Sequence, residues 1–199
     1  MLQVTIISNN AYFKSGLRNL LAGMTGGNDT GDTSPLSFSF QHDPCTVPDI
    51  IFRDFMVTIN MTSSRSYRNV QARQERGQVI HIPFTCRGLT IEEIAMKVRK
   101  IFLVASAGYG AATHTDFYKS AGLKRYLQLS VTENNIMLLT GQGNDTSEIS
   151  RLLHRSERTI GTHCRNAIKK MGMENRLEFY KYASCLAKYG EGNGITLCI

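Results

Sequence analysis

Four cationic side chains gather between Ser156 and Met171, where one acid opposes them. Arg and Lys bind phosphate oxygens, and an Arg guanidinium can also donate two parallel hydrogen bonds to a guanine base. Apolar residues recur in this segment at helical spacing, which predicts an amphipathic helix with a cationic polar face. An ordinary solvated helix shows the same charge pattern, so charge alone leaves both interpretations open. The cations are Arg158, Arg165, Lys169 and Lys170, and the apolar residues are Ile160, Ala167, Ile168 and Met171.

Groups that could bind a metal or act as nucleophiles are scattered. His163 and Cys164 are neighbours on the predicted helix, so their side chains diverge by about 100 degrees and form no chelating pair by themselves. The 5 cysteines include no Cys-x-x-Cys pair, which favours reduced thiols over a zinc site or a disulfide framework. We therefore expect no metal, no cofactor and no enzymatic activity. An enzyme acting on nucleic acid is the third hypothesis, and no catalytic constellation in the sequence recommends it.

Composition limits the class of protein. The hydrophobic residues, 42% of the sequence, indicate a folded chain, and the formal net charge of +7 makes nucleic acid or an anionic membrane surface a candidate partner. The longest apolar run, residues 101–105, is far shorter than the roughly 20 residues of a membrane span. We expect a cytoplasmic protein without a membrane partner.

The first 105 residues alternate strand and helix patterns. Short apolar runs at 2–7 and 47–55 predict buried strands, and a helical period follows each of the runs "LQVTII" and "VIHIPF". Thr90 is the expected start of the second helix. This pattern predicts an α/β domain with a mainly parallel sheet over residues 1–105, followed by a linker over 106–128.

From Leu129 onward the apolar period is helical. Four short helices in residues 129–199, with a tight turn between the second and third, predict an all-α helix-turn-helix domain. Capping residues are expected at the starts of the first three helices, and glycines at the stops of the first and the third. The starts are Ser130, Asp145 and Ser156, the stops are Gly143 and Gly172, and a last helix is expected from about Asn175 to Lys188.

The spacing of this unit resembles the LuxR/NarL-type helix-turn-helix of bacterial transcription regulators. The resemblance implies double-stranded DNA as the partner and a homodimer, or a heterodimer with another LuxR-type regulator, with RNA polymerase as a further candidate. The residues at pattern positions are Leu129, Ser130, Glu133, Ile136, Leu139, Gly143, Glu148, Ile149, Leu153, Ser156, Thr159, Ile160, His163, Asn166, Lys170, Gly172, Asn175, Arg176 and Glu178.

By the same resemblance, Thr162 and Arg165 face the major groove. The sequence departs from the family pattern at Thr132, Arg155 and Gly161, and the last of these stands where a Lys commonly faces DNA. The other candidate DNA-binding residues are Ser156, Arg158, Thr159, Gly161, His163, Asn166, Lys169 and Lys170.

The N-terminal part resembles a shortened response-regulator receiver, which would place Asp54 at the phosphoacceptor position. Ser8 and Asn9 stand where such receivers carry an acidic pair for a divalent cation, and Arg87 follows Asp54 by only 33 residues. We therefore interpret Asp54 as a strand-end carboxylate with local hydrogen bonds, and the domain as a docking or dimerisation module.

The leading hypothesis is a sequence-specific regulator that works without phosphorylation of Asp54. One alternative is a co-regulator that acts mainly through another regulator, since the RSER turn and the GYG-containing linker resemble atypical capsule-phosphorelay co-regulators. The other is a response regulator that depends on phosphorylated Asp54. The basic segment from Arg65 to Arg76 is interpreted as a solvated loop, with extra phosphate or partner contacts as its alternative.

Overall fold

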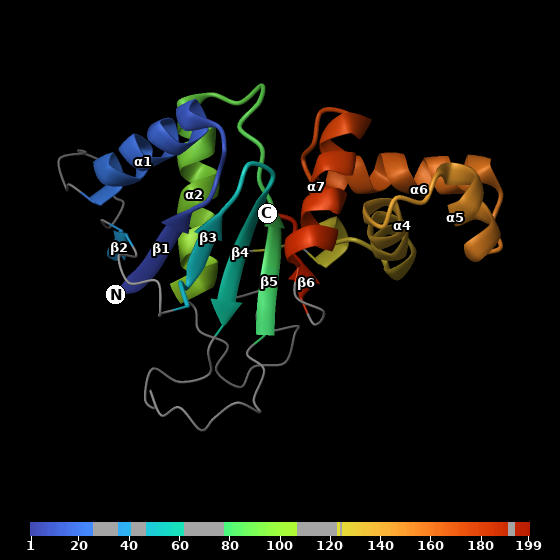
Figure 1. Ribbon diagram of the computed structural model, residues 1–199, viewed down its shortest axis with the longest axis horizontal. Helices are drawn as coiled ribbons and strands as arrows, with labels where there is room; N and C mark the ends of the chain where they lie inside the picture. Colours follow the sequence, from blue (N-terminus) through green and yellow to red (C-terminus); the bar gives the residue numbers. More distant parts are fainter. Residues whose placement is uncertain (26–35, 41–46, 62–77, 107–122, 124, 191–193) are drawn as a thin grey trace.

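The computed structural model describes residues 1–25, 36–40, 47–61, 78–106, 123, 125–190 and 194–199. Figure 1 shows the sheet with α1 and α2 in one half and α4, α5 and α6 in the other, with α7 and β6 between them. No helix within these ranges combines the length and the apolar character that a bilayer span requires.

The sheet half contains most of the strands. Its elements are β1 (Leu2–Ile6), α1 (Ala11–Thr25), β2 (Phe38–Phe40), β3 (Ile50–Phe52), β4 (Met56–Met61), β5 (Gln78–Pro83) and α2 (Ile91–Ser106). The helical half contains η1 (Arg125–Leu127), α4 (Val131–Gly141), α5 (Thr146–Leu152), α6 (Glu157–Lys170) and α7 (Arg176–Tyr189), and β6 (Ile195–Thr196) follows.

The strands form one sheet in the order β2-β1-β3-β4-β5-β6. Only β4 runs against the others, because β3 pairs with β4 and β4 pairs with β5 in antiparallel fashion, while the remaining pairs are parallel. The expected α/β domain with a mainly parallel sheet is therefore confirmed. The order of the first five strands is that of flavodoxin-like sheets, although those sheets connect parallel strands through helices.

The reversal at β4 follows from the length of its connection. Residues 53–55 are the whole link between β3 and β4, and so short a link joins only antiparallel neighbours. The sequence interpretation treated residues 47–55 as one strand and missed β4. The sequence of β4, "MVTINM", is apolar enough to predict a strand, but the interpretation did not assign one there. The segment from Arg65 to Arg76 and most of the expected linker lie outside the described residues.

Helices α1 and α2 build the main core against one face of the sheet. Leu21 of α1, Val98 of α2 and Ile50 of β3 all belong to this core and are fully buried. Alternate side chains of a strand point to opposite faces. Accordingly, Val57 of β4 joins this core, whereas its neighbour Met56 joins the core of the helical half.

Helix α7 lies against the sheet half at the β3–β4 turn and against β4. The Arg53 guanidinium stacks on the Tyr189 ring, with 4.9 Å from Cζ to the ring centroid, and the Lys181 ammonium lies 5.1 Å from the centroid of Phe55. The Thr85 hydroxyl donates to Oε1 of the buried Glu178 at 3.2 Å. These contacts hold α7 against the sheet half.

A buried histidine lies beneath this contact. His81 of β5 is 1% exposed, and its Nδ1 lies 3.4 Å from the hydroxyl of Thr58, to which Arg53 also donates. Burial lowers the pKa of His81 to about 4, and the nearby Arg53 cation acts in the same direction. The imidazole is therefore neutral near pH 7.

Residues 194–199 tie the helical half to the sheet, which the sequence did not predict. Ile195 and Thr196 form β6, which adds to β5 in parallel register. Leu197 is buried in the sheet core and Cys198 in the helical core. The Gln128 amide donates to the Cys198 carbonyl and accepts from the Cys198 N–H, each at 2.9 Å. The expected helical domain, residues 129–199, thus ends in a strand of the other half.

Candidate nucleic-acid interface

Capping residues set the helix boundaries of the C-terminal half as the sequence predicted. Ser130 and Asp145 each form a capping box with the Glu three residues later, which satisfies N–H groups at the starts of α4 and α5. Gly143 and Gly172 have positive φ values of 94° and 64°, a conformation that suits glycine after a helix end. Asn175 caps α7.

The turn between α5 and α6 is tight. His154 has a φ of 51°, which is the left-handed region that non-glycine residues rarely adopt. The Arg155 N–H donates to the Ser150 carbonyl at 3.0 Å, and the Ser150 hydroxyl donates back to the Arg155 carbonyl at 2.5 Å. This reciprocal pair fixes α6 relative to α5.

Helix α6 begins at an exposed N-cap. The Ser156 side chain accepts from the Thr159 N–H at 3.1 Å, and the two hydroxyls lie 2.9 Å apart. This start leaves the amino end of α6 accessible, where backbone N–H groups and the helix dipole favour an anion such as a phosphate.

The outer face of α6 is a stripe of exposed polar side chains. Residues four, seven and eleven positions apart share one face of a helix. The opposite face packs Ile160, Cys164 and Ala167 into the domain, and each of them is buried. The burial of one face therefore fixes which side chains point outward. The exposed stripe consists of Arg158, Thr162, Arg165 and Lys169.

Within the stripe, a directional chain of hydrogen bonds holds Arg165. The Thr162 hydroxyl donates to the Arg158 carbonyl at 3.0 Å, so its oxygen is free to accept. Arg165 Nη2 donates to that oxygen at 3.1 Å. A Cβ placed on Gly161 would meet only Nη1 of Arg165, at 3.8 Å, so the guanidinium lies over the glycine.

The remaining candidate residues lie at the edges of this stripe or behind it. Asn166 is exposed beside Arg165, whereas Thr159 and His163 are half-buried. Thr159 takes part in the helix cap described above. The sequence grouped all of these residues on one surface, and the structure places Asn166 closest to the exposed face.

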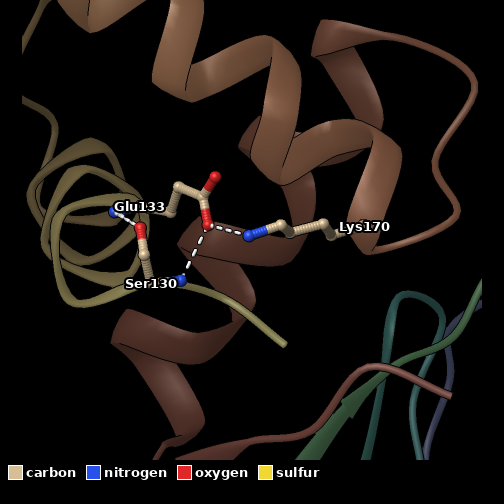
Figure 2. A network of polar contacts seen from close by, with 3 residues as sticks. All are labelled: Ser130, Glu133 and Lys170. Atoms are coloured by element: carbon tan, nitrogen blue, oxygen red, sulfur yellow. Dashed lines mark hydrogen bonds and ion pairs between the residues drawn. The ribbon is translucent and has the colours of Figure 1, made fainter. Parts of the chain in front are cut away.

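Lys170 is paired inside the domain. Its Nζ donates to Glu133 Oε2 at 2.7 Å, and the same carboxylate oxygen accepts from the Ser130 N–H (Figure 2). The Glu133 side chain is 4% exposed and the Lys170 side chain 26%. Burial alone would raise the pKa of Glu133, but the hydrogen bonds from Lys170 and Ser130 outweigh it and lower the pKa. The pair therefore braces α6 against the start of α4.

A second contact that the sequence did not assign joins α5 to α7. Arg176 donates to the Thr146 hydroxyl at 2.8 Å, and its guanidinium lies 5.3 Å from the Tyr180 ring centroid. The sequence marked Arg176 as a pattern position, but its hydrogen-bond partner Thr146 lies on another helix and leaves no local signal, whereas Tyr180 lies four residues further along α7 itself.

The neighbours His163 and Cys164 separate as expected for adjacent positions on a helix. Cys164 is buried, and burial raises the pKa of its thiol. Within the part of the chain that the structure describes, no group of three His, Cys, Asp or Glu residues could hold a metal ion.

Asp54 lies in the β3–β4 turn. The Ser8 hydroxyl donates to Asp54 Oδ1 at 2.5 Å, and the Asn10 N–H donates to the same hydroxyl at 2.8 Å. The neighbouring residues Arg53 and Phe55 make the contacts to α7 described above. The carboxylate is thus held by polar groups that follow β1.

The arrangement of α4 to α7 is that of a helix-turn-helix protein whose α6 presents a cationic face. Residues 127–183 match the family described as "Bacterial regulatory proteins, luxR family", which spans α4, α5, α6 and half of α7. This part of the chain is a LuxR-family helix-turn-helix domain, and the resemblance seen in the sequence is confirmed.

Comparison with solved structures gives matches of low identity and low TM-score. The RcsB response regulator of Salmonella typhimurium is 16% identical, covers 92% of this chain and 98% of its own, and has a TM-score of 0.32. A structure described as two RcsB dimers bound to two parallel DNAs is 17% identical, and the match covers 92% of this chain and 98% of the RcsB chain with a TM-score of 0.31. Scores this low do not establish a shared arrangement. A search of curated proteins finds no match.

Proposed function

We propose that this protein is a sequence-specific transcription regulator that binds double-stranded DNA in a bacterial cytoplasm through α6. The observation that carries the proposal is the exposed stripe Arg158, Thr162, Arg165 and Lys169 on the third helix of a LuxR-family domain. A helix with such a face fits the major groove, which admits one α-helix.

Each part of α6 has a role in this proposal. Thr162 and Arg165 face base edges, while Arg158 and Lys169 lie at the two ends of the stripe and contact phosphates on either side of the groove. The Ser156 cap brings the amino end of α6 to a third phosphate. Lys170 braces the domain through Glu133 rather than contacting DNA.

The proposed active form is a dimer. Two half-sites about one helical turn apart would be read by two copies of α6, which multiplies the specificity of one short helix. We favour a homodimer, with a heterodimer containing another LuxR-type regulator as the alternative. RNA polymerase is the proposed contact for activation.

Regulation in this proposal does not use phosphorylation of Asp54. The residues after β1, Ser8 to Asn10, carry no carboxylate to hold the divalent cation that phosphoryl transfer to Asp requires. The Ser8 hydroxyl donates a hydrogen bond to Oδ1 of Asp54. Adding magnesium with beryllium fluoride should leave the oligomeric state and DNA affinity unchanged. A change that disappears in Asp54→Ala would contradict this.

Gly161 favours a second candidate function, that of a co-regulator with little DNA affinity of its own. Gly161 has no side chain where the family commonly carries a Lys, and a Cβ there would meet Arg165 Nη1, so the helix has one phosphate or base contact fewer. Tight binding of selected DNA by the purified chain alone would rule this candidate out.

The main test is binding of the purified full chain to genomic fragments, followed by titration of an enriched fragment at several salt concentrations. Each phosphate that a cation neutralises contributes a slope of about 0.9 to the fall of log K with log salt. Lys169→Met and Arg158→Met should each reduce that slope by about 0.9 per bound subunit, or about 1.8 for the proposed dimer. An unchanged slope in both variants would refute the proposed use of α6.

A further inference from the structure

The guanidinium of Arg165 has a defined position on the exposed face of α6, although an exposed Arg normally samples many rotamers. It is held at one side by Thr162 and lies over the open space at Gly161. Two hydrogen bonds in series run from Arg165 to the Thr162 hydroxyl and from that hydroxyl to the Arg158 carbonyl, and each has one donor and one acceptor.

This arrangement leaves the guanidinium able to make a bidentate contact. A guanidinium carries five N–H donors. Thr162 uses one N–H of Nη2, and whichever one it uses, a pair of parallel N–H groups remains free. A pair of parallel donors matches the O6 and N7 acceptors of guanine in the major groove.

Resting on the proposed function, we infer that Arg165 reads a guanine base, that Thr162 is its positioning residue, and that Gly161 is the vacancy the guanidinium requires. The glycine then has a role of its own in recognition, since a long side chain at position 161 would compete for the space above it. Specificity comes from one preorganised Arg rather than from two side chains at 161 and 165.

Preorganisation predicts how the variants differ. A bidentate contact to guanine contributes about 5- to 150-fold discrimination against other bases, and Arg165→Ala should lose it. Thr162→Val keeps the β-branched shape but frees the guanidinium, and ordering one long side chain costs about 2- to 12-fold in binding. If Thr162 acts only through Arg165, Thr162→Val should have no further effect in the Arg165→Ala background.

Position 161 provides a matched pair. Gly161→Ala adds a methyl group at ordinary contact distance from Arg165 Nη1, so the guanine preference should be retained. Gly161→Leu extends into the space of the guanidinium and should weaken the preference. Both substitutions replace a glycine inside a helix and favour helix formation. A loss of preference in the leucine variant therefore cannot be attributed to unfolding.

The experiment is a selection by the purified full chain from a library of DNA duplexes with a randomised core, followed by sequencing. The wild type should enrich sites with a fixed guanine, Arg165→Ala and Gly161→Leu should lose that guanine, and Gly161→Ala and Lys169→Ala should retain it. Enrichment of the same guanine by Arg165→Ala would overturn the inference alone. Equal losses from Thr162→Val with and without Arg165 would overturn the positioning role. If the wild type enriches no sequence, the proposed function fails and the inference fails with it.

Discussion

The ion pair between Lys170 and Glu133 decides whether the cation at the end of α6 serves stability or DNA binding. In Lys170→Met the apolar stem remains, while the buried carboxylate loses its partner at 2.7 Å. A hydrogen bond to a charged group contributes about 1.5 to 3 kcal/mol. The Lys side chain is 26% exposed, so solvent replaces part of the interaction. We therefore expect a loss of about 2 kcal/mol in unfolding free energy at pH 7.

The matched control is Lys169→Met, which removes the same charge from the exposed stripe. Its unfolding free energy should change by less than about 0.5 kcal/mol, as is usual for surface substitutions. In DNA titrations the pattern reverses, because Lys169→Met should lower the salt slope by about 0.9 per bound subunit and Lys170→Met should leave it unchanged.

The pH dependence gives a second check on the ion pair. The pKa of Glu133 is lowered in the folded protein, so its contribution is present above the unfolded pKa and is lost as pH falls through the folded one. Urea unfolding should thus separate wild type from Lys170→Met at pH 7 and bring them together as the pH falls below the lowered pKa of Glu133. Equal stability of Lys170→Met and Lys169→Met at pH 7 would refute the bracing role.

Three further outcomes are expected. Gly141→Ala should lower the unfolding free energy by about 1–3 kcal/mol, because its methyl group would overlap the backbone carbonyl of Ala183. Gly16 lies in open space inside α1, so Gly16→Ala should raise the unfolding free energy by up to about 1 kcal/mol. Thermal unfolding of the two variants measures both changes. His81 should bind a proton only in the unfolded chain between pH 6.5 and about 4, so stability should fall by roughly 3 kcal/mol as pH drops across that window. A pH series of urea unfolding should show this slope flattened in His81→Gln, and an identical slope would contradict the assignment. Leu197→Ala should cost about 2–5 kcal/mol and lower hydrogen-exchange protection in β5, and a loss of protection confined to the helical half would argue against the tail's role in the sheet.

Local interactions explain what the sequence could predict. The boundaries of α4, α5 and α6 depend on contacts between residues three apart, such as Ser130 with Glu133, and these are visible as spacing. The outward stripe on α6 follows in the same way from helical periodicity and from the family resemblance.

Contacts between distant residues explain what it could not predict. Lys170 pairs with a residue on another helix, so it looked like one more cation of the exposed face. Strand β6 is only two residues long, which is too short for a period, and its partner β5 lies in the other half of the chain. The relation of Gly161 to Arg165 depends on a side-chain rotamer, which composition does not encode.

The position of β6 has a consequence for how this protein can be divided. The sheet reaches its sixth strand only when residues synthesised more than a hundred positions after β5 return to it. A fragment that stops after α2 would leave the β5 edge unpaired, and such an edge invites pairing with other chains. A fragment that starts at α4 would contain Leu197 but lack the core of the sheet half in which Leu197 is buried. Expression of either half alone therefore risks aggregation, and the whole chain is the unit in which both halves fold.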